Sequence, residues 1–474
     1  MLAIFCFAEF IDAFSASCLF PAIGPLSASL HPTVGPTEVS WVFSAYSATF
    51  AAFLLISGRV ADVYSSRICF IVGAFLIGAF SLGAGFAHSK IVFFLLRALA
   101  GIGAALNVPS ALRLIVEWFP DPREETIAIV IYGAGGGIGN VLGVIIGGVF
   151  VQYVTWRWIL WFIGIICIAT SLLALIVVPP SPSSAHPHPH SFAQLDIGGV
   201  SSITVAIILF IYALTEGPID GWSSAKCLAP LLISVSLAVL FFVYEARVSE
   251  SMAALPPKVW QYQNVPVLFA VAFVPFWWWA TLSLNTIPYW IDTYNWSPIV
   301  ASIHFLPNGI MAILSAMLVP ALTKMWPPKR VITLGLLLTC AGTILLPFAD
   351  RKERYWSLYL PAFLLGSSGC NFVSIDANVA ILLNTPSEMA GVTGAIYNAA
   401  LQLAIALGVA INTSIVQSID DRRSSRGEVV GYEGIAAGYW FNLAFVGVML
   451  VVVLVSYKAE GSPDIAHDKG QVTK

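Results

Sequence analysis

Long apolar runs separated by short polar segments dominate this chain of 474 residues and limit how it can fold. A run of about 20 apolar residues is long enough for a helix to cross a bilayer. The runs are continuous and do not alternate with polar residues, which favours spanning helices over the strands of a membrane barrel. We predict an all-α membrane protein with fourteen spans: 2–23, 39–57, 68–87, 91–117, 125–151, 158–178, 196–215, 227–245, 264–287, 300–323, 331–348, 355–383, 390–416 and 437–457.

The composition supports a membrane protein and excludes several other classes. Mean hydropathy is +0.86, and only 10% of the residues are charged. The net charge of −3 comes with no basic patch, so no nucleic-acid partner is expected. The seven cysteines contain no Cys-x-x-Cys pair and are interpreted as small core residues, with no disulfide or zinc framework. The first apolar run lacks the basic residues of a signal peptide and is long enough to span, so we expect a membrane helix there.

Polar segments divide the predicted spans into a 6 + 2 + 6 layout. A Pro/Ser/His-rich stretch follows the sixth span, and its His-Pro-His-Pro-His run is interpreted as solvated linker in preference to a metal site. We predict a six-helix bundle at 1–178, a cytoplasmic linker at 179–195, two inserted helices at 196–245, a second six-helix bundle at 264–457 and a polar cytoplasmic tail at 458–474. Internal repetition of this kind is typical of transporters.

Ionisable residues inside the spans are few, and each costs about 2.5–3.5 kcal/mol to insert, so they are candidate functional residues. They are Glu9 and Asp12 in span 1, Arg97 in span 4 and Asp376 in span 12. Glu9 and Asp12 are three residues apart and share one helix face. Two carboxylates that close disfavour simultaneous ionisation, so the pair could load and release a proton. Arg97 is the expected counter-charge, and a permanent salt bridge between spans 1 and 4 is the structural alternative.

Four glycines recur at four-residue spacing in span 5, at positions Gly135, Gly139, Gly143 and Gly147. They form one smooth stripe, which predicts close packing against another helix. The glycine-rich run at 133–139 does not match Gly-x-Gly-x-x-Gly, because Ile138 stands where the third glycine would be. No Walker A motif occurs, so ATP-driven pumping is not supported, and we expect no cofactor.

Three motifs carry a resemblance to the major facilitator superfamily. The stretch 58–67, interpreted as a charged loop, resembles the family's loop 2–3 signature, with matches at Gly58, Asp62 and Arg67. The stretch 97–105 resembles the Arg-x-x-Gln-Gly-x-Gly-x-Ala motif of span 4. The stretch 143–148 resembles the antiporter motif Gly-Pro-x-x-Gly-Gly, with Val144 in place of proline. The resemblance implies that Gly58, Asp62 and Arg67 latch the cytoplasmic side and that Arg97 takes part in proton transfer.

Further segments resemble the 14-span drug:proton antiporter branch. They are Leu19–Ile23 following Asp12, the Trp41…Tyr46 pattern, Trp156-Arg157-Trp158 and the stretch 195–199. The run 36–64 resembles fungal members most. With the signature loop on the cytoplasmic side, both termini are cytoplasmic. The resemblance implies a multi-pass protein of the plasma membrane, with the vacuolar membrane as an alternative.

In a fold of this family, spans 1, 4, 9 and 12 would line a central cavity. Span 9 contributes Trp277, Trp278 and Trp279, whose faces suit flat apolar or cationic ligands. Interfacial belt positions are the alternative for these tryptophans. The remaining substrate-binding candidates are polar residues of spans 12 and 13, for which interhelical hydrogen bonding is the alternative: Asn371, Tyr397, Asn398 and Gln402.

The sequence therefore predicts a monomeric, proton-coupled secondary transporter that exports a small amphipathic organic compound, namely a drug, toxin or secreted metabolite. Its partners would be this small molecule and the lipid bilayer. Uptake by proton symport is an alternative, because Val144 replaces the motif proline. A non-transporting membrane sensor on the same fold is another. An enzyme is not expected, because no Ser/His/Asp set, metal cluster or cofactor motif appears.

Overall fold

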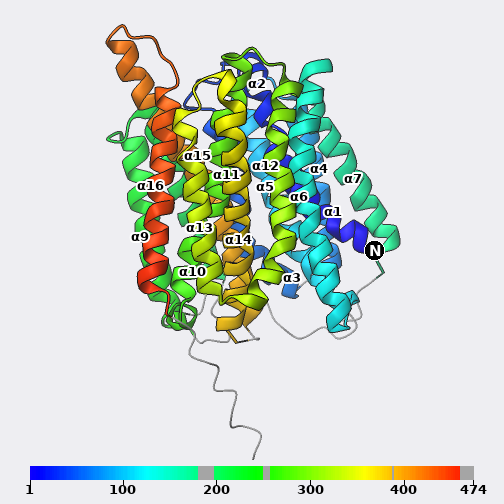
Figure 1. Ribbon diagram of the computed structural model, residues 1–474. Helices are drawn as coiled ribbons and strands as arrows, with labels where there is room; N and C mark the ends of the chain where they lie inside the picture. Colours follow the sequence, from blue (N-terminus) through cyan, green and yellow to red (C-terminus); the bar gives the residue numbers. More distant parts are fainter. Residues whose placement is uncertain (64, 180–196, 249–256, 387–388, 459–474) are drawn as a thin grey trace, which may run out of the picture.

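The described part of the chain is built from helices that run side by side (Figure 1). The computed structural model describes residues 1–63, 65–179, 197–248, 257–386 and 389–458. Within these residues the only β-type pairing is one isolated bridge between His31 and Ser89. The predicted all-α class is confirmed.

The first half of the chain contributes one broken entry segment, α1 to α2, and five long helices. In chain order they are α1 (Leu2–Ser17), the 3-10 turn η1 (Phe20–Ala22), α2 (Ile23–Ser29), α3 (Ser40–Val63), α4 (Ser66–Phe86), α5 (Lys90–Trp118), α6 (Pro122–Tyr153) and α7 (Arg157–Val177). We call α1–α7 the N-terminal half.

Two further helices, α8 (Ile197–Asp220) and α9 (Ala225–Glu245), precede the last six spans. The remaining elements form the C-terminal half: η4 (Pro257–Gln261), α10 (Val265–Val271), α11 (Phe273–Asp292), α12 (Pro298–Met325), α13 (Pro328–Thr343), η5 (Leu346–Phe348), η6 (Lys352–Arg354), the π-helical turn η7 (Tyr355–Tyr359), α14 (Leu360–Asn384), α15 (Ala390–Ser425) and α16 (Glu433–Ser456).

Thirteen helical segments of the described residues are long and apolar enough to cross a membrane. The remaining long helix is α3, whose apolar part Ser40–Leu54 corresponds to the predicted span at 39–57. Together these segments account for the fourteen predicted spans. The prediction of a charged loop at 58–67 is wrong in part, because α3 continues to Val63 and α4 begins at Ser66. No proline interrupts the end of α3, so its charged residues extend the helix.

Two predicted spans are broken helices. Span 2–23 stops at Ser17 and continues as a 3-10 turn in which Pro21 cannot donate a backbone hydrogen bond. Span 264–287 divides between Val271 and Phe273. The proline four residues beyond Val271, Pro275, removes the hydrogen bond that its carbonyl would accept. Both breaks involve a proline, which a count of apolar residues does not register.

Helices α1 and α6 lie against each other along the glycine stripe. A Cβ added at Gly135, Gly139, Gly143 or Gly147 would meet the backbone of Cys6, Phe10, Phe14 and Cys18, respectively. The two series of residues rise in the same four-residue steps, so the helices contact through backbone over four turns. Absence of side chains on α6 permits this approach.

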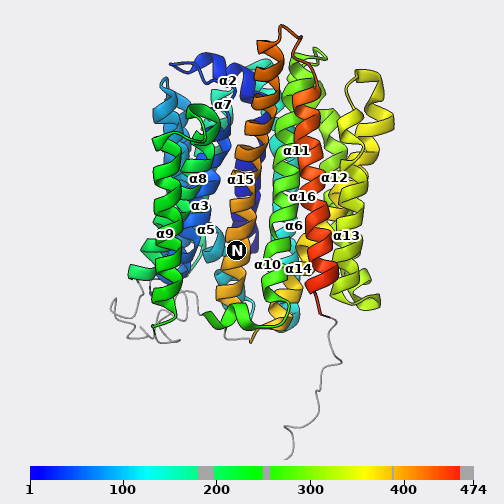
Figure 2. The ribbon, with the colours of Figure 1, turned by 90° about the vertical axis from the view of Figure 1, so that its left-hand side faces the viewer.

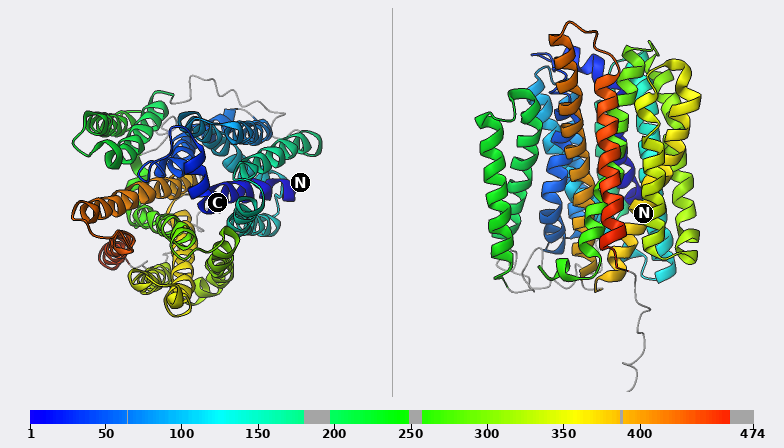
Figure 3. Two further views of the ribbon diagram at one scale, coloured as in Figure 1. Left: turned by 90° about the horizontal axis from the view of Figure 1, so that it is seen from above. Right: turned by 60° about the vertical axis from the view of Figure 1, so that its left-hand side comes forward.

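The two halves meet along two seams, where α3 packs against α15 and α6 against α12. Figure 3 shows the blue-to-teal helices of the N-terminal half beside the green-to-red helices of the C-terminal half. Helices α8 and α9 pack on each other at the periphery, and α8 contacts both α3 and α15 (Figure 2). In Figure 1 the start of α1 and the end of α16 lie toward the lower end of the bundle, while α2 lies at the upper end. We name these ends the lower and upper faces.

Candidate functional site

A cavity of about 360 Å³ lies between the two halves, near the middle of the bundle. Its size falls in the range of about 300–1,000 Å³ typical of small-molecule sites. The polar residues that line it are Glu9, Asp12, Asn140, Asn308, Ser367, Asn371, Ser374, Asn378, Asn398 and Gln402. Phe50, Phe276, Trp278 and Trp279 supply its aromatic surface. The cavity is therefore amphipathic, and the charged residues among its described lining are two carboxylates of α1.

Asp12 connects the two halves across this cavity. Its side chain is 7% exposed. Its Oδ1 accepts a hydrogen bond of 2.6 Å from the Tyr46 hydroxyl of α3, and its Oδ2 accepts one of 3.3 Å from Gln402 Nε2 of α15. Both partners donate, so the arrangement suits an ionised carboxylate. Gln402, predicted to orient a ligand, instead contacts the carboxylate and lines the cavity as well.

Glu9 lies one helical turn from Asp12 and lines the same cavity. Its side chain packs on α6, where a Cβ added at Gly136 would lie 2.9 Å from Glu9 Cγ. The Tyr132 hydroxyl is within hydrogen-bonding reach of Glu9 and donates to the Val108 carbonyl at 3.2 Å. The structure thus brings the two predicted carboxylates to one cavity wall.

Arg97 is 1% exposed, but its contacts differ from those expected. Its Nη1 donates to Ser15 Oγ at 3.0 Å, and its Cζ lies 4.7 Å from the centroid of the Tyr46 ring. The described ion pairs include none between Arg97 and either carboxylate, so the predicted direct counter-charge is not formed. Tyr46 stands between them, with its ring on the guanidinium and its hydroxyl on Asp12. The Trp41…Tyr46 pattern was the signal that could have identified it.

Asp376 of α14 is fully buried and is not among the residues that line the cavity. Tyr397, another predicted ligand residue, is also buried and donates to the Ser374 carbonyl at 2.6 Å. The Tyr397 side chain therefore forms a hydrogen bond between α15 and α14, which was the alternative to a ligand contact. The proton-coupling role of Asp376 remains a prediction.

The three consecutive tryptophans of α11 point to different surroundings. Trp278 and Trp279 line the cavity, and Trp278 Nε1 donates to Thr343 Oγ1 at 2.8 Å. Trp277 lies outside the lining and stacks on Phe445 of α16, with ring centroids 4.6 Å apart. Successive helical residues are rotated by about 100°, so one helix cannot direct all three into one cavity. The prediction that Trp277 contacts substrate is therefore not supported by its position.

Asn371 and Asn398 line the cavity as predicted, and each donates to a carbonyl one turn earlier on its own helix, at 2.9 and 3.0 Å. Sequence reasoning missed several neutral lining residues: Asn140, Asn308, Ser367, Ser374 and Asn378. Ser367 hydrogen-bonds Asn308, joining α14 to α12 beside the cavity. Their mid-span positions are the signal that could have identified them.

The predicted latch lies at the lower face. Arg67 donates from Nε to the Val178 carbonyl at 2.6 Å and from Nη2 to the Leu175 carbonyl at 2.8 Å. It thus ties α4 to the C-terminal end of α7, within the N-terminal half. Gly58 and Asp62 belong to the last turns of α3, and the surroundings of these two residues lie outside the described part of the structure. The latch role is still a prediction.

The described residues contain no group of three His, Cys, Asp or Glu side chains that could hold a metal ion. The His-Pro run lies outside the described residues. All seven cysteines are free thiols. The described lining of the cavity offers hydrogen-bonding groups, aromatic rings and two carboxylates.

A bundle of membrane-length helices in two halves, with an amphipathic cavity between them, is the architecture typical of secondary transporters. Residues 5–409 match the Major Facilitator Superfamily, and the chain belongs to that family. Members of this family are transporters, so the expectation that the chain is not an enzyme agrees with its membership.

Several relatives are named for transport or for resistance. The chain is 30% identical over 455 residues to the puromycin resistance protein pur8 of Streptomyces alboniger, covering 93% of this chain and 88% of that protein. It is 26% identical over 465 residues to the major facilitator superfamily multidrug transporter mfsC of Aspergillus fumigatus, covering 95% and 85%. It is 26% identical over 396 residues to the low affinity ammonium transporter of Saccharomyces cerevisiae, covering 82% and 76%.

The fold is also found in solved structures. An auto-inhibited POT family peptide transporter superposes with a TM-score of 0.70 at 15% identity, covering 98% of each chain. At that identity the likeness concerns the fold alone.

Proposed function

We propose that this transporter exports small amphipathic organic compounds in exchange for protons. The names of the puromycin and multidrug relatives support export of such compounds. The amphipathic cavity supports the same substrate class, because aromatic and amide side chains share its surface. We place the lower face in the cytoplasm and the protein in the plasma membrane, with the vacuolar membrane as the alternative.

The observation that carries the proposal is the bridge from Asp12 of α1 to Gln402 of α15. It is a hydrogen bond between the two halves, made by a carboxylate inside the substrate cavity. Hydrogen bonds to a charged group contribute about 1.5–3 kcal/mol, more than neutral ones. Protonation of Asp12 removes the charge and weakens its hold on Gln402. Proton binding and the relative position of the halves are thereby coupled.

Glu9 and Tyr132 extend this carboxylate site by one turn toward the lower face. The Arg97 guanidinium lies over the ring of Tyr46. In the proposed cycle a proton from the outside loads the Asp12–Glu9 pair, the halves reorient, and the proton leaves on the cytoplasmic side. The membrane potential supplies about 2.3 kcal/mol per charge per 100 mV. A pH difference adds about 1.4 kcal/mol per unit.

We assign the chain to the 14-span drug:proton antiporter branch and divide it as predicted. Residues 1–178 and 264–457 are the two bundles that rock against each other, and 196–245 is the inserted pair. The contacts of α8 with both α3 and α15 support its treatment as a separate unit. The predicted linker, 179–195, and the predicted tail, 458–474, lie outside the described residues except for their first residues, Pro179 and Lys458.

The test is transport by the purified chain in liposomes with an imposed pH gradient. We expect the wild type to move a fluorescent amphipathic compound when the gradient is present and to stop when a protonophore is added. Asp12→Asn keeps the shape of the side chain and should abolish gradient-driven transport. Asp421→Asn, an exposed carboxylate outside the cavity, is the matched control and should transport normally. An unchanged pH dependence in Asp12→Asn would contradict the proposal.

A second candidate is proton-coupled uptake, and the yeast relative named as an ammonium transporter suggests a small cation as the substrate to test. The same liposomes decide between the two functions. Radiolabelled methylammonium, a small cation, would accumulate with the proton gradient if the chain works as a symporter. We expect no such accumulation, because a cavity of about 360 Å³ with aromatic walls suits larger compounds.

A further inference from the structure

A second cavity of about 420 Å³ lies at the upper end of the bundle, between the two halves. We call it the upper pocket. It is formed by the segment from Ile23 to Val39 in the N-terminal half and by α11, α15 and α16 in the C-terminal half. It shares no lining residue with the central cavity. Its size is that of a site for a drug-sized molecule.

The two walls of the upper pocket differ in chemistry. The N-terminal wall is mainly apolar, with Ile23, Val34 and Val39 among its residues. The C-terminal wall is polar and has a rigid base. There Asn285 of α11 and Asn412 of α15 exchange two amide hydrogen bonds, of 3.0 and 2.7 Å. A molecule with one apolar side and one polar side would match both walls at once.

The polar wall also carries negative charge. Asp292 is the last residue of α11, and Asp420 lies in the last turns of α15. Helix C-termini carry a partial negative charge, where acidic residues are unfavourable and cations favourable. Asp420 Oδ1 is buried and has no hydrogen-bond partner among the described residues. A positively charged group in the pocket would compensate both carboxylates and both helix ends.

Among the described residues, no cation lines the upper pocket, because none of the lining residues is Lys, Arg or His. Arg423 lies outside the lining and acts on Asp420 electrostatically, but it is itself paired with Glu433 at 3.2 Å and with Glu428 at 3.4 Å. The described lining therefore carries two carboxylates and no cation, which favours a positively charged ligand.

We propose that the upper pocket is a second binding site, for amphipathic organic cations. Its apolar wall would hold the hydrocarbon part of the ligand, and Asp292 and Asp420 would hold the charge. The second site adds to the proposed function and rests on it only for the orientation in the membrane. With the lower face in the cytoplasm, the upper pocket is on the release side, and its preference for cations selects which exported compounds pause there.

The test measures binding to the full chain in nanodiscs, after subtraction of binding to empty nanodiscs. The probe is tetraphenylphosphonium, and tetraphenylborate is its matched anion of the same shape. The measurement is made in a Gln402→Ala background to weaken the central site. We expect saturable binding of the phosphonium and none of the borate. Asp292→Asn together with Asp420→Asn should weaken phosphonium binding about tenfold or more, which corresponds to about 1.4 kcal/mol or more.

Two controls keep the outcome decisive. Asp421→Asn removes the same charge one residue away, outside the lining, and should leave binding within about twofold, since exposed charges are screened. Ser27→Phe fills the apolar side of the pocket without changing charge and should also block binding. Equal binding of the two probes, or an equal loss in Asp421→Asn and in the double variant, would overturn the proposal. Because binding in nanodiscs needs no proton gradient, a failure of proton-driven export would leave this result standing.

Discussion

The two halves of the molecule face the central cavity with different chemistry. The N-terminal half brings both lining carboxylates, Glu9 and Asp12, and buries Arg97 behind them. The C-terminal half lines the cavity with amides, hydroxyls and aromatic rings, and it buries its own carboxylate, Asp376, away from the lining. Under the proposed function, this difference would divide the labour, with proton handling in the N-terminal half and substrate contact in the C-terminal half.

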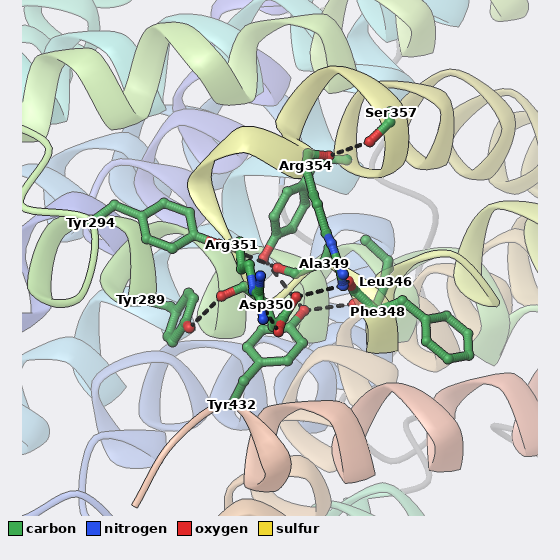
Figure 4. A network of polar contacts seen from close by, with 11 residues as sticks. Tyr289, Tyr294, Leu346, Phe348, Ala349, Asp350, Arg351, Arg354, Ser357 and Tyr432 are labelled. Atoms are coloured by element: carbon green, nitrogen blue, oxygen red, sulfur yellow. Dashed lines mark hydrogen bonds and ion pairs between the residues drawn. The ribbon is translucent and has the colours of Figure 1, made fainter.

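A second difference lies at the upper face. The N-terminal half fastens its first loop by an ion pair, in which Lys90 Nζ lies 2.7 Å from Glu38, and by backbone hydrogen bonds between His31 and residues 88–90. The C-terminal half uses the network in Figure 4, where three tyrosines donate to backbone carbonyls between Leu346 and Asp350. Arg354 adds an ion pair of 2.7 Å to Asp350. Side chains therefore hold the first loop mainly by charge, and hold the second segment by neutral tyrosine bonds as well as by charge.

The largest effect should come from the close packing of α6 on α1, the helix that carries Glu9 and Asp12. Gly139→Ala would place a Cβ against the Phe10 carbonyl and should lower stability by about 1–3 kcal/mol, as overpacking does. Gly133→Ala on the same helix meets nothing within 4 Å and is the control. Thermal unfolding of the purified variants measures the difference. Equal melting temperatures would show that α1 and α6 do not need their backbone contact.

The division of labour predicts different losses for the two donors to Asp12. Tyr46→Phe removes a 2.6 Å bond on the proton side and should reduce gradient-driven transport about tenfold or more, since bonds to charged groups contribute about 1.5–3 kcal/mol. Gln402→Ala removes the 3.3 Å bond across the halves and also alters the cavity lining, so it should weaken proton coupling and raise KM as well. Liposome transport at several pH values and substrate concentrations separates the two results. If Tyr46→Phe raised KM and left gradient-driven transport unchanged, the assignment of the halves would be reversed.

A smaller effect should distinguish two neighbouring tryptophans of α11. Trp279→Phe changes the cavity surface and should raise KM about two- to fivefold, in keeping with the energy of an aromatic contact. Trp277→Phe alters only the stack on Phe445 and should leave KM unchanged. Transport kinetics with one substrate measure both variants. A larger change in Trp277→Phe would place the substrate elsewhere.

The smallest effect should be a pH-dependent loss at the upper face. Burial opposes ionisation of Glu38, but Lys90 and the Gly35 N–H outweigh it, so the pKa of Glu38 lies below its ordinary value. The stability it contributes is present above its unfolded-state pKa and is lost as pH falls through its folded-state pKa. Glu38→Gln should therefore cost about 0.5–1 kcal/mol at neutral pH and nothing in acid. A melting-temperature difference that persists in acid would contradict this.

The number and type of helices could be predicted because span length is a property of local sequence. The breaks at Pro21 and Pro275 could be noticed only by weighing single prolines inside apolar runs. The partner of Arg97 could not be predicted, because it depends on how three helices are rotated about their axes. The same reason explains why Trp277 was assigned to the cavity and Asn308 was overlooked. Residue type identifies candidates, and helix rotation decides among them.

The matched steps of α1 and α6 also bear on how such a protein changes over time. Cys6, Phe10, Phe14 and Cys18 present backbone to four glycines, so α6 cannot acquire a side chain at these glycines unless α1 withdraws. We therefore expect the two helices to change together in evolution, although more than a hundred residues of chain separate them. A chimera that takes α1 from a relative should fold only when α6 is taken from the same relative.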